Sequence, residues 1–309
     1  MPTLRSGAIH LFKLAGIDVY LHWWWFLAAA YFLQRAQGQY GSIVWSVLEY
    51  LALFLIVLTH EFGHALACRQ VGGDANQIVL WPLGGVAYVN PPQRPGAMLW
   101  SIAAGPLVNV VLLPVLYFAN SLTAGMSLDV QNLVNAVFWI NVLLLCFNIL
   151  PVYPLDGGQI LRSLLWFPLG RARSLMVATV VGFIGIVAFI GLALYSRSVW
   201  YLLMSAYLLM NCWSGLKQAR ALLKIAKLPR REGFACPSCH TAPPIGAYWL
   251  CRNCNQPFDT FATGGVCSHC GARFEEATCL DCRRQFPMSQ WIPGNLHNAS
   301  ATNPGFHPN

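Results

Sequence analysis

Long apolar stretches dominate the pattern of hydrophobic and polar positions along this chain. Most reach or approach the length that a helix needs to cross the roughly 30 Å hydrocarbon core of a bilayer. The first is short and includes three consecutive tryptophans. It lacks the small-residue cleavage site of a signal peptide, so we expect it to remain as a span. We therefore predict a polytopic α-helical membrane protein with about six transmembrane helices, at Tyr20–Leu33, Ile43–Ala67, Ala97–Asn120, Leu133–Leu150, Leu175–Leu194 and Val199–Trp213.

Composition supports this class. The chain is 56% hydrophobic and 10% charged, with a mean hydropathy of +0.51, whereas soluble domains carry roughly 25% charged residues. If the N-terminus is cytoplasmic, six crossings put most of the loop arginines and the whole C-terminal tail on the same side, as the positive-inside rule expects. We predict cytoplasmic termini, basic residues that face anionic lipid, and a prokaryotic plasma membrane as the location.

The second apolar stretch contains three ionisable residues, His60, Glu61 and His64. Such groups are costly at membrane depth, so their presence favours a functional site that faces the protein interior. Histidines at positions i and i+4 of a helix share one face and can bind one Zn²⁺, while the intervening glutamate acts as general base towards a water. A polar contact between helices is the alternative, and it accounts poorly for all three residues.

Asp156 is the candidate for the third zinc ligand. It follows Pro151 and Pro154, which break a helix at the end of an apolar stretch. Non-helical backbone at that depth is tolerated where it is buried in protein or lines a wet cavity. The alternative is that Asp156 caps a helix over Gly157–Leu165, and both roles are compatible.

These residues fall into motifs that resemble those of the site-2 protease family, the intramembrane zinc metalloproteases. The segments His60-Glu61-x-x-His64 and Asn148-x-x-Pro151-x-x-x-x-Asp156-Gly157 resemble its two signature motifs. Gly105-Pro106-Leu107-Val108-Asn109 is similar to its G-x-x-x-N element, and Trp81–Val86 to its loop after the zinc helix. The resemblance covers about Ile9 to Lys227. No segment resembles the PDZ insertion or the cystathionine-synthase-type domain of other branches.

The resemblance implies that His60, His64 and Asp156 bind a catalytic zinc and that Glu61 is the general acid/base. It also implies that Asn148 lies near the scissile carbonyl, where an amide NH₂ can donate to a developing oxyanion. A hydrogen bond at the helix end is the alternative for Asn148. For Asn109 we expect helix packing rather than direct catalysis.

A segment after the second apolar stretch predicts a hairpin. Two β-prone runs flank Gly84-Gly85, which is a hairpin signal. An edge strand there, with Val86 and Tyr88 as substrate-binding residues, can hold a substrate extended by strand addition. A re-entrant hairpin that only closes the cavity is the alternative.

The composition changes after Pro229. Eight of the 11 cysteines form four C-x-x-C pairs, at Cys236/Cys239, Cys251/Cys254, Cys267/Cys270 and Cys279/Cys282. Such pairs predict structural zinc, and a cytoplasmic location disfavours disulfides. We predict two Cys₄ ribbons, the first pair with the second and the third with the fourth. An interleaved pairing of the first with the third is the alternative.

These features divide the chain into a membrane metalloprotease domain (1–227), a cytoplasmic double zinc ribbon (228–286) and a disordered tail (287–309), with one catalytic and two structural zinc ions. Arginines and acids balance within Phe234–Phe286, which disfavours nucleic acid and favours a protein partner for the ribbons. We predict an endopeptidase that cleaves membrane-anchored proteins near the cytoplasmic face. The rivals are a zinc transporter and an inactive scaffold, and neither needs a non-ligating base such as Glu61.

Overall fold

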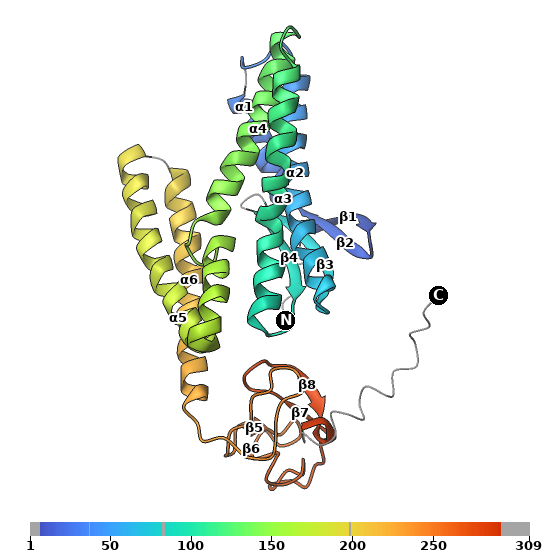
Figure 1. The fold of residues 1–309 in the computed structure, drawn as a ribbon, viewed down its shortest axis with the longest axis vertical. Coiled ribbons are helices and arrows are strands. Elements are labelled where there is room, and N and C mark those ends of the chain that lie inside the picture. The colour runs from blue at the N-terminus through green and yellow to red at the C-terminus, as the bar shows by residue number, and fades with distance from the viewer. Residues whose placement is uncertain (1–6, 37, 82–83, 198, 292–309) are drawn as a thin grey trace. The chain divides into compact units, whose positions relative to one another are not determined.

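The computed structural model describes residues 7–36, 38–81, 84–197 and 199–291 of the 309-residue chain, in two compact units (Figure 1). Unit 1 comprises Met1–Gly170 and Ser174–Leu216, and unit 2 comprises Arg171–Arg173 and Lys217–Asn309. The longer elements are β1 (Ala8–Leu14), β2 (Ile17–His22), α1 (Trp24–Arg35), α2 (Ile43–Gln70), β3 (Asp74–Trp81), β4 (Gly84–Asn90), α3 (Pro95–Leu122), α4 (Leu128–Ile149), α5 (Asp156–Ser196) and α6 (Val199–Ala226).

Four helices of the described residues, α2, α3, α4 and α5, are long and apolar enough to cross a membrane. The predicted span Tyr20–Leu33 was wrong at its start, because Tyr20–His22 belongs to β2. Helix α1 has 12 residues, which at 1.5 Å per residue gives about 18 Å, short of the hydrocarbon core. The chain is an integral membrane protein, and the count of about six spans stays a prediction.

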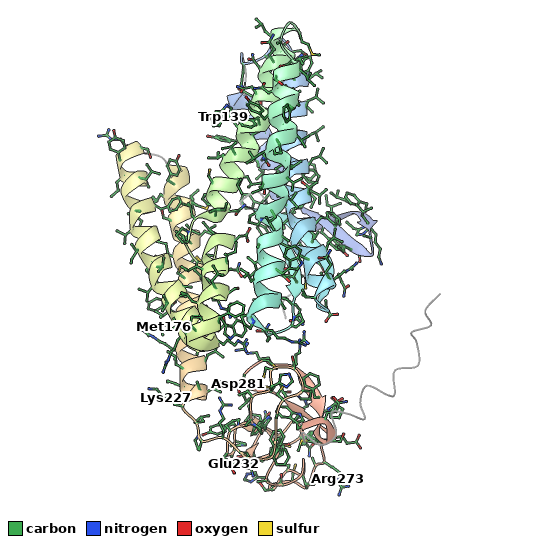
Figure 2. All side chains as sticks on the ribbon, viewed as in Figure 1. Trp139, Met176, Lys227, Glu232, Arg273 and Asp281 are labelled. Atoms are coloured by element: carbon green, nitrogen blue, oxygen red, sulfur yellow. The ribbon has the colours of Figure 1, made fainter. Side chains whose placement is uncertain are left out.

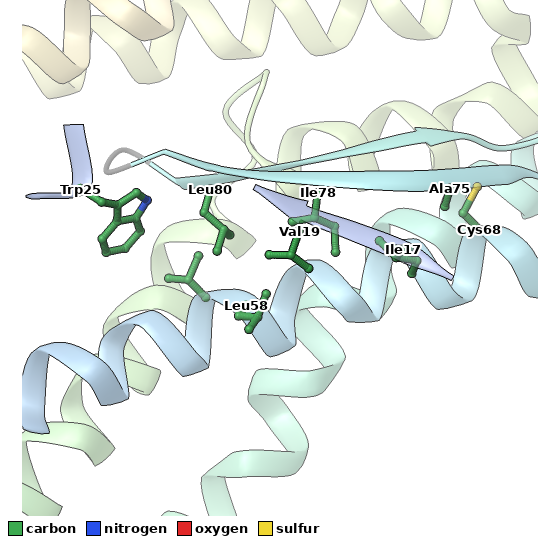
Figure 3. Close-up of a cluster of buried hydrophobic side chains, with 10 residues drawn as sticks. Ile17, Val19, Trp25, Leu58, Cys68, Ala75, Ile78 and Leu80 are labelled. Carbon is green, nitrogen blue, oxygen red and sulfur yellow. The ribbon is translucent and has the colours of Figure 1, made fainter. Parts of the chain in front are cut away.

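A four-stranded sheet with the order β1-β2-β3-β4 packs on α2. β3 and β4 form the predicted antiparallel hairpin, in which Trp81 pairs with Gly84; Pro82 and Leu83 lie outside the described residues. β2 joins β3 in parallel, a pairing that the sequence did not predict. Apolar side chains of the sheet, such as Val19 and Ile78, contact Leu58 on α2 in one buried cluster (Figure 3).

Helices α2, α3 and α4 lie side by side in unit 1 (Figure 1). α2 and α3 approach closely at Gly63, where an added Cβ atom would lie 2.8 Å from the carbonyl oxygen of Ala104. The outward faces of these helices carry large apolar side chains, of which Trp139 on α4 is 58% exposed (Figure 2). Because these residues are apolar and face outward, lipid can cover them.

The break between α4 and α5 matches the prediction from the two prolines. α4 ends at Ile149 and α5 begins at Asp156. A second interruption lies within α5 at Gly170, which has φ 76° and ψ 170°, a backbone conformation that favours glycine. It separates the helix expected over Gly157–Leu165 from the apolar stretch predicted to span. The later part of α5 packs on α6 through Ile186 and Leu208.

The described residues of unit 2 form two small antiparallel hairpins and a short 3₁₀ helix. The hairpins are β5 (Trp249–Leu250) with β6 (Pro257–Phe258) and β7 (Glu276–Thr278) with β8 (Gln285–Pro287). The 3₁₀ helix Met288–Trp291 puts Trp291, fully buried, into the core of this unit. The prediction that the tail is disordered from residue 287 was therefore wrong for 287–291, because Trp291 contributes to the core. Residues 292–309 lie outside the described residues.

Candidate metal centre

Helix α2 presents His60 and His64 on one face, one turn apart. Both side chains are buried, and Glu61 between them is buried as well. The Nε2 atoms of the two histidines lie 3.1 Å apart, with the ring planes inclined at 83°. The two imidazoles therefore point at one common position, as the i and i+4 spacing predicts.

Asp156 reaches this position from the start of α5. Its Oδ2 atom lies 3.0 Å from Nε2 of His60 and 3.3 Å from Nε2 of His64. As the first residue of α5 it also places a carboxylate at the positive end of a helix, where negative charge is favoured. The expected capping role was wrong, because Leu155 is the N-cap of α5 and no described side chain caps this helix end.

Helices α5 and α6 hold the turn that carries Asp156. The thiol of Cys212 on α6 donates to the carbonyl oxygen of Tyr153, at 2.7 Å. An added Cβ atom at Gly215 would lie 2.7 Å from the Tyr153 ring, so the small residue makes room for it. Val152 is buried in the apolar cluster between α5 and α6. These contacts fix the turn against α5 and α6.

The spacing of the three ligand atoms fits one zinc ion. Ligand atoms bound to a tetrahedral ion at about 2.0–2.1 Å lie roughly 3.3 Å apart, and the three atoms here are separated by 3.0, 3.1 and 3.3 Å. Two imidazoles and one carboxylate form a donor set that is found at catalytic zinc, which keeps a fourth position for water or substrate.

The other ring nitrogen of each histidine is bonded to α3. Nδ1 of His64 lies 2.9 Å from the backbone carbonyl oxygen of Ser101. Nδ1 of His60 lies 2.6 Å from Oδ1 of Asn109. Both acceptors fix the Nδ1–H tautomer and leave Nε2 for the metal. Asn109 thus contacts a ligand directly, beyond the packing role that the sequence suggested.

Gly105 makes the contact between α3 and the histidines possible. An added Cβ atom there would lie 2.3 Å from Nε2 of His64 and 2.8 Å from Nε2 of His60. These are the two metal-facing atoms, so any larger residue at this position would occupy the candidate zinc site. The glycine of the G-x-x-x-N element is therefore required by the site as well as by helix packing.

Comparisons with known proteins agree with this geometry. The model of Peptidase family M50 matches residues 49–126 and 120–192, a region that contains all three candidate ligands. Residues 49–192 of this chain are thus similar to the M50 family. The chain is 32% identical over 175 residues to a zinc metalloprotease of Methanocaldococcus jannaschii. The alignment covers 57% of this chain and 50% of that protein.

Two further relatives extend this finding. Stage IV sporulation protein FB of Bacillus subtilis is 32% identical over 149 residues, 46% of this chain and 50% of that protein. The solved site-2 protease from M. jannaschii aligns with a TM-score of 0.50 and 28% identity, over 68% of this chain and 95% of that one. The chain thus spans about half the length of these two curated relatives.

The remaining predicted residues lie on elements that contact α2. Asn148 is half-buried in the last turn of α4, immediately before the turn that leads to Asp156. Val86 and Tyr88 lie on β4, at one edge of the sheet, with Tyr88 39% exposed. Their roles stay predictions.

One residue of the site was missed at the sequence level. Asn141 on α4 is fully buried and hydrogen-bonded to Asn109. It belongs to neither signature motif. A signal was nevertheless present, because an amide in the middle of an apolar membrane helix is costly unless it has a polar partner.

The cysteines of unit 2 form two clusters whose pairing differs from the predicted one. The first and fourth pairs come together, as do the second and third, giving Cys236, Cys239, Cys279 and Cys282 in one cluster and Cys251, Cys254, Cys267 and Cys270 in the other. The prediction of two successive ribbons was wrong, and so was its interleaved alternative. The inner cluster is nested within the loop closed by the outer one.

Sulfur spacing in both clusters suits structural zinc. Sγ of Cys236 lies 3.6 Å from that of Cys282, and Sγ of Cys254 lies 3.7 Å from that of Cys267. Thiolates bound to a tetrahedral zinc ion at about 2.3 Å are roughly 3.8 Å apart. The eight cysteines therefore fit two Cys₄ sites. Cysteines of both clusters and Trp291 belong to one buried core.

Proposed function

We propose that this chain is an intramembrane zinc endopeptidase of the M50 family that cleaves membrane-anchored proteins near the cytoplasmic face. The observation that supports this most directly is the convergence of Nε2 of His60, Nε2 of His64 and Oδ2 of Asp156 within 3.3 Å, beside a buried glutamate that the ligand set does not use. A zinc ion held by these residues would polarise a peptide carbonyl and lower the pKa of a coordinated water towards neutrality.

Glu61 is the proton carrier in this proposal. Its carboxylate takes a proton from the attacking water as the new C–O bond forms. It then delivers this proton to the amide nitrogen as the C–N bond breaks, so that a new carboxyl and a new amino terminus result. Glu61 suits this role because it is buried next to His60 on α2 and is not one of the three ligands.

Asn148 is proposed to stabilise the carbonyl oxygen. Its amide NH₂ can donate to the negative charge that develops on the oxygen during attack, and one such donor contributes about 10²–10³-fold in rate. Its position at the end of α4, just before the turn that carries Asp156, supports this assignment.

β4 is proposed to hold the substrate in an extended form. A helical substrate hides its backbone carbonyls, so a segment must unwind before cleavage. β4 is at the edge of the four-stranded sheet, which packs on the helix that carries the two histidines. A substrate strand that pairs with the segment containing Val86 and Tyr88 would be extended close to α2.

The orientation is proposed from charge and from the sheet. β2 pairs with β3, so the N-terminal segment and the chain after α2 lie in one layer. Arg69, in the last turn of α2, donates to the carbonyl oxygens of Ala15 and Gly16. Both features support placing the N-terminus and the His64 end of α2 on the cytoplasmic side of a prokaryotic plasma membrane.

Unit 2 is proposed to be a cytoplasmic module that recognises a protein partner or regulates access of substrates. Tyr248 and Leu250 on its surface are 44% and 68% exposed, on either side of the buried Trp249. Exposed apolar side chains of this kind are typical of protein contact sites. Two zinc ions bound by the cysteine clusters would stabilise the unit.

Substitution of Glu61 by glutamine tests the proposed activity. The amide cannot accept the proton, so cleavage of a co-expressed membrane-anchored substrate should fall by about 10²–10⁴-fold while zinc content stays the same. Glu49→Gln is the matched control on the same helix, since Glu49 is also buried and accepts from the hydroxyl of Tyr40. Cleavage retained by Glu61→Gln would overturn the proposal.

Substrates can be found with the same variant. Quantitative proteomics of membrane fractions from cells with the wild-type chain or Glu61→Gln should show uncleaved substrates that accumulate only with the variant. A zinc transporter would instead keep its transport in Glu61→Gln, because the ligands are unchanged.

A further inference from the structure

A buried pair of asparagines connects α4 to the zinc ligand His60. Asn109 on α3 and Asn141 on α4 both have no exposed surface. Nδ2 of Asn109 donates to Oδ1 of Asn141, at 2.8 Å. Nδ2 of Asn141 donates back to the backbone carbonyl oxygen of Asn109, at 3.0 Å. Two amides paired in this way between apolar helices satisfy each other, but only in one orientation.

The backbone carbonyl decides that orientation. A carbonyl oxygen can only accept, so Asn141 must direct its NH₂ group at Asn109 O. Oδ1 of Asn141 is then the acceptor for the amide of Asn109. It follows that Asn109 turns its NH₂ group towards Asn141 and its Oδ1 towards His60. An amide flip at either residue would place donor against donor or acceptor against acceptor.

The fixed orientation of the Asn109 amide also determines the tautomer of the His60 imidazole. Oδ1 of Asn109 lies 2.6 Å from Nδ1 of His60 and accepts, so Nδ1 carries the hydrogen. Nε2 is then left with its lone pair towards the site formed with His64 and Asp156. Without Asn141, the amide of Asn109 could rotate by 180° and offer its NH₂ group to Nδ1, which would favour the tautomer that cannot bind metal through Nε2.

His64 is held in the same Nδ1–H tautomer without an intervening side chain. Its Nδ1 faces the backbone carbonyl oxygen of Ser101 directly, at 2.9 Å, and a backbone oxygen has no second orientation. The two histidines therefore differ: the tautomer of His64 is set by the backbone of α3, whereas that of His60 depends on a side chain that can flip.

We propose that Asn141 is a positioning residue that fixes Asn109, and through it the metal-binding tautomer of His60. The proposal rests on the proposed zinc site and names a residue on α4 that does not touch substrate or metal. Outer hydrogen-bond partners of zinc-bound histidines commonly contribute 10–100-fold in metal affinity, and Asn141 acts at one further step.

Zinc affinity of the full chain tests the proposal independently of peptidase activity. Zinc is titrated with chelators of graded affinity. We assign to this site the zinc that the wild-type chain retains and an Asp156→Ala chain loses. Asn141→Leu should weaken that affinity by about 10–100-fold. Asn135→Leu, at an exposed position of the same helix, should leave it unchanged.

A double-substitution cycle distinguishes an effect through the hydrogen-bond chain from Asn141 through Asn109 to His60 from a general loss of packing. Asn109→Leu should also weaken zinc binding. Adding Asn141→Leu to Asn109→Leu should cause no further loss of zinc affinity, because the hydrogen-bond chain to His60 is already broken. Asn141→Ser keeps a hydroxyl that can donate and accept, so its affinity should lie between those of wild type and Asn141→Leu. Asn141→Ser takes the place of Asn141→Leu in this test if the leucine variant does not fold.

Two results would overturn the proposal. One is unchanged zinc affinity in Asn141→Leu, even if that chain melts at a lower temperature, since the residue would then contribute only to stability. The other is additive losses in the double variant. Neither result depends on cleavage, so a failure of the proposed peptidase activity would be seen separately in Glu61→Gln.

Discussion

Oδ2 of Asp156 lies 3.0 Å from Nε2 of His60, although the two residues are 96 positions apart in the chain and belong to helices α5 and α2. The turn before Asp156 makes this approach possible, because it ends α4 and is held by contacts with α6. The candidate zinc site is therefore split between two helices, and each half can be tested separately.

Removing the carboxylate should empty the membrane site alone. Asp156→Asn keeps the shape of the side chain but replaces an anionic ligand by a neutral amide, so zinc per full chain should fall from about three ions to about two. Metal analysis of the purified protein gives this number, and cleavage should be lost with the ion. Asp129→Asn, at the start of α4, is the control that should retain all three. A full complement of zinc in Asp156→Asn would contradict the assignment of this ligand.

Gly105→Ala should displace the metal rather than unfold the chain. The new Cβ atom would lie 2.3 Å from Nε2 of His64, so either the imidazole or α3 must shift. We expect at least about tenfold weaker zinc binding at this site, comparable to the loss of an outer partner. Gly96→Ala is the matched control on the same helix, because an added Cβ atom there meets nothing within 4 Å. Equal zinc affinity of the two variants would show that α3 adapts freely.

The nested cysteine pairing makes a prediction about zinc number. Replacing the first and fourth pairs together by serine removes the ligands of one cluster only, so about two zinc ions per chain should remain. Replacing the first and second pairs damages both clusters, and about one should remain. Metal analysis of the two full-length variants distinguishes the alternatives. The successive pairing that we expected from the sequence would reverse these two numbers.

Proline on β4 should impair cleavage without removing zinc. Val86→Pro or Tyr88→Pro takes away a backbone N–H group and restricts the strand, so a substrate could no longer pair with it. Cleavage and zinc content are measured on the same preparation. Leu11→Pro is the control, since it lies at the irregularity of β1 on the opposite edge of the sheet, where proline is tolerated. Unimpaired cleavage in both β4 variants would contradict strand addition.

The local parts of the candidate site could be predicted from residue spacing alone. Two histidines at i and i+4 must share a face of α2, and two prolines must end α4 near Leu150, because both effects act within one or two helical turns. The same is true of the C-x-x-C pairs, each of which brings two thiolates together through a short turn.

Which of these local parts come together became clear from the folded chain. The partner of Asn109 on α4, the parallel pairing of β2 with β3 and the nested order of the cysteine pairs all join segments that are distant in the chain. Sequence spacing does not fix such contacts, because any of several pairings would satisfy the same local rules. What selects among them is the burial of common cores, such as the one that Trp291 completes, and the need of each buried polar group for a partner.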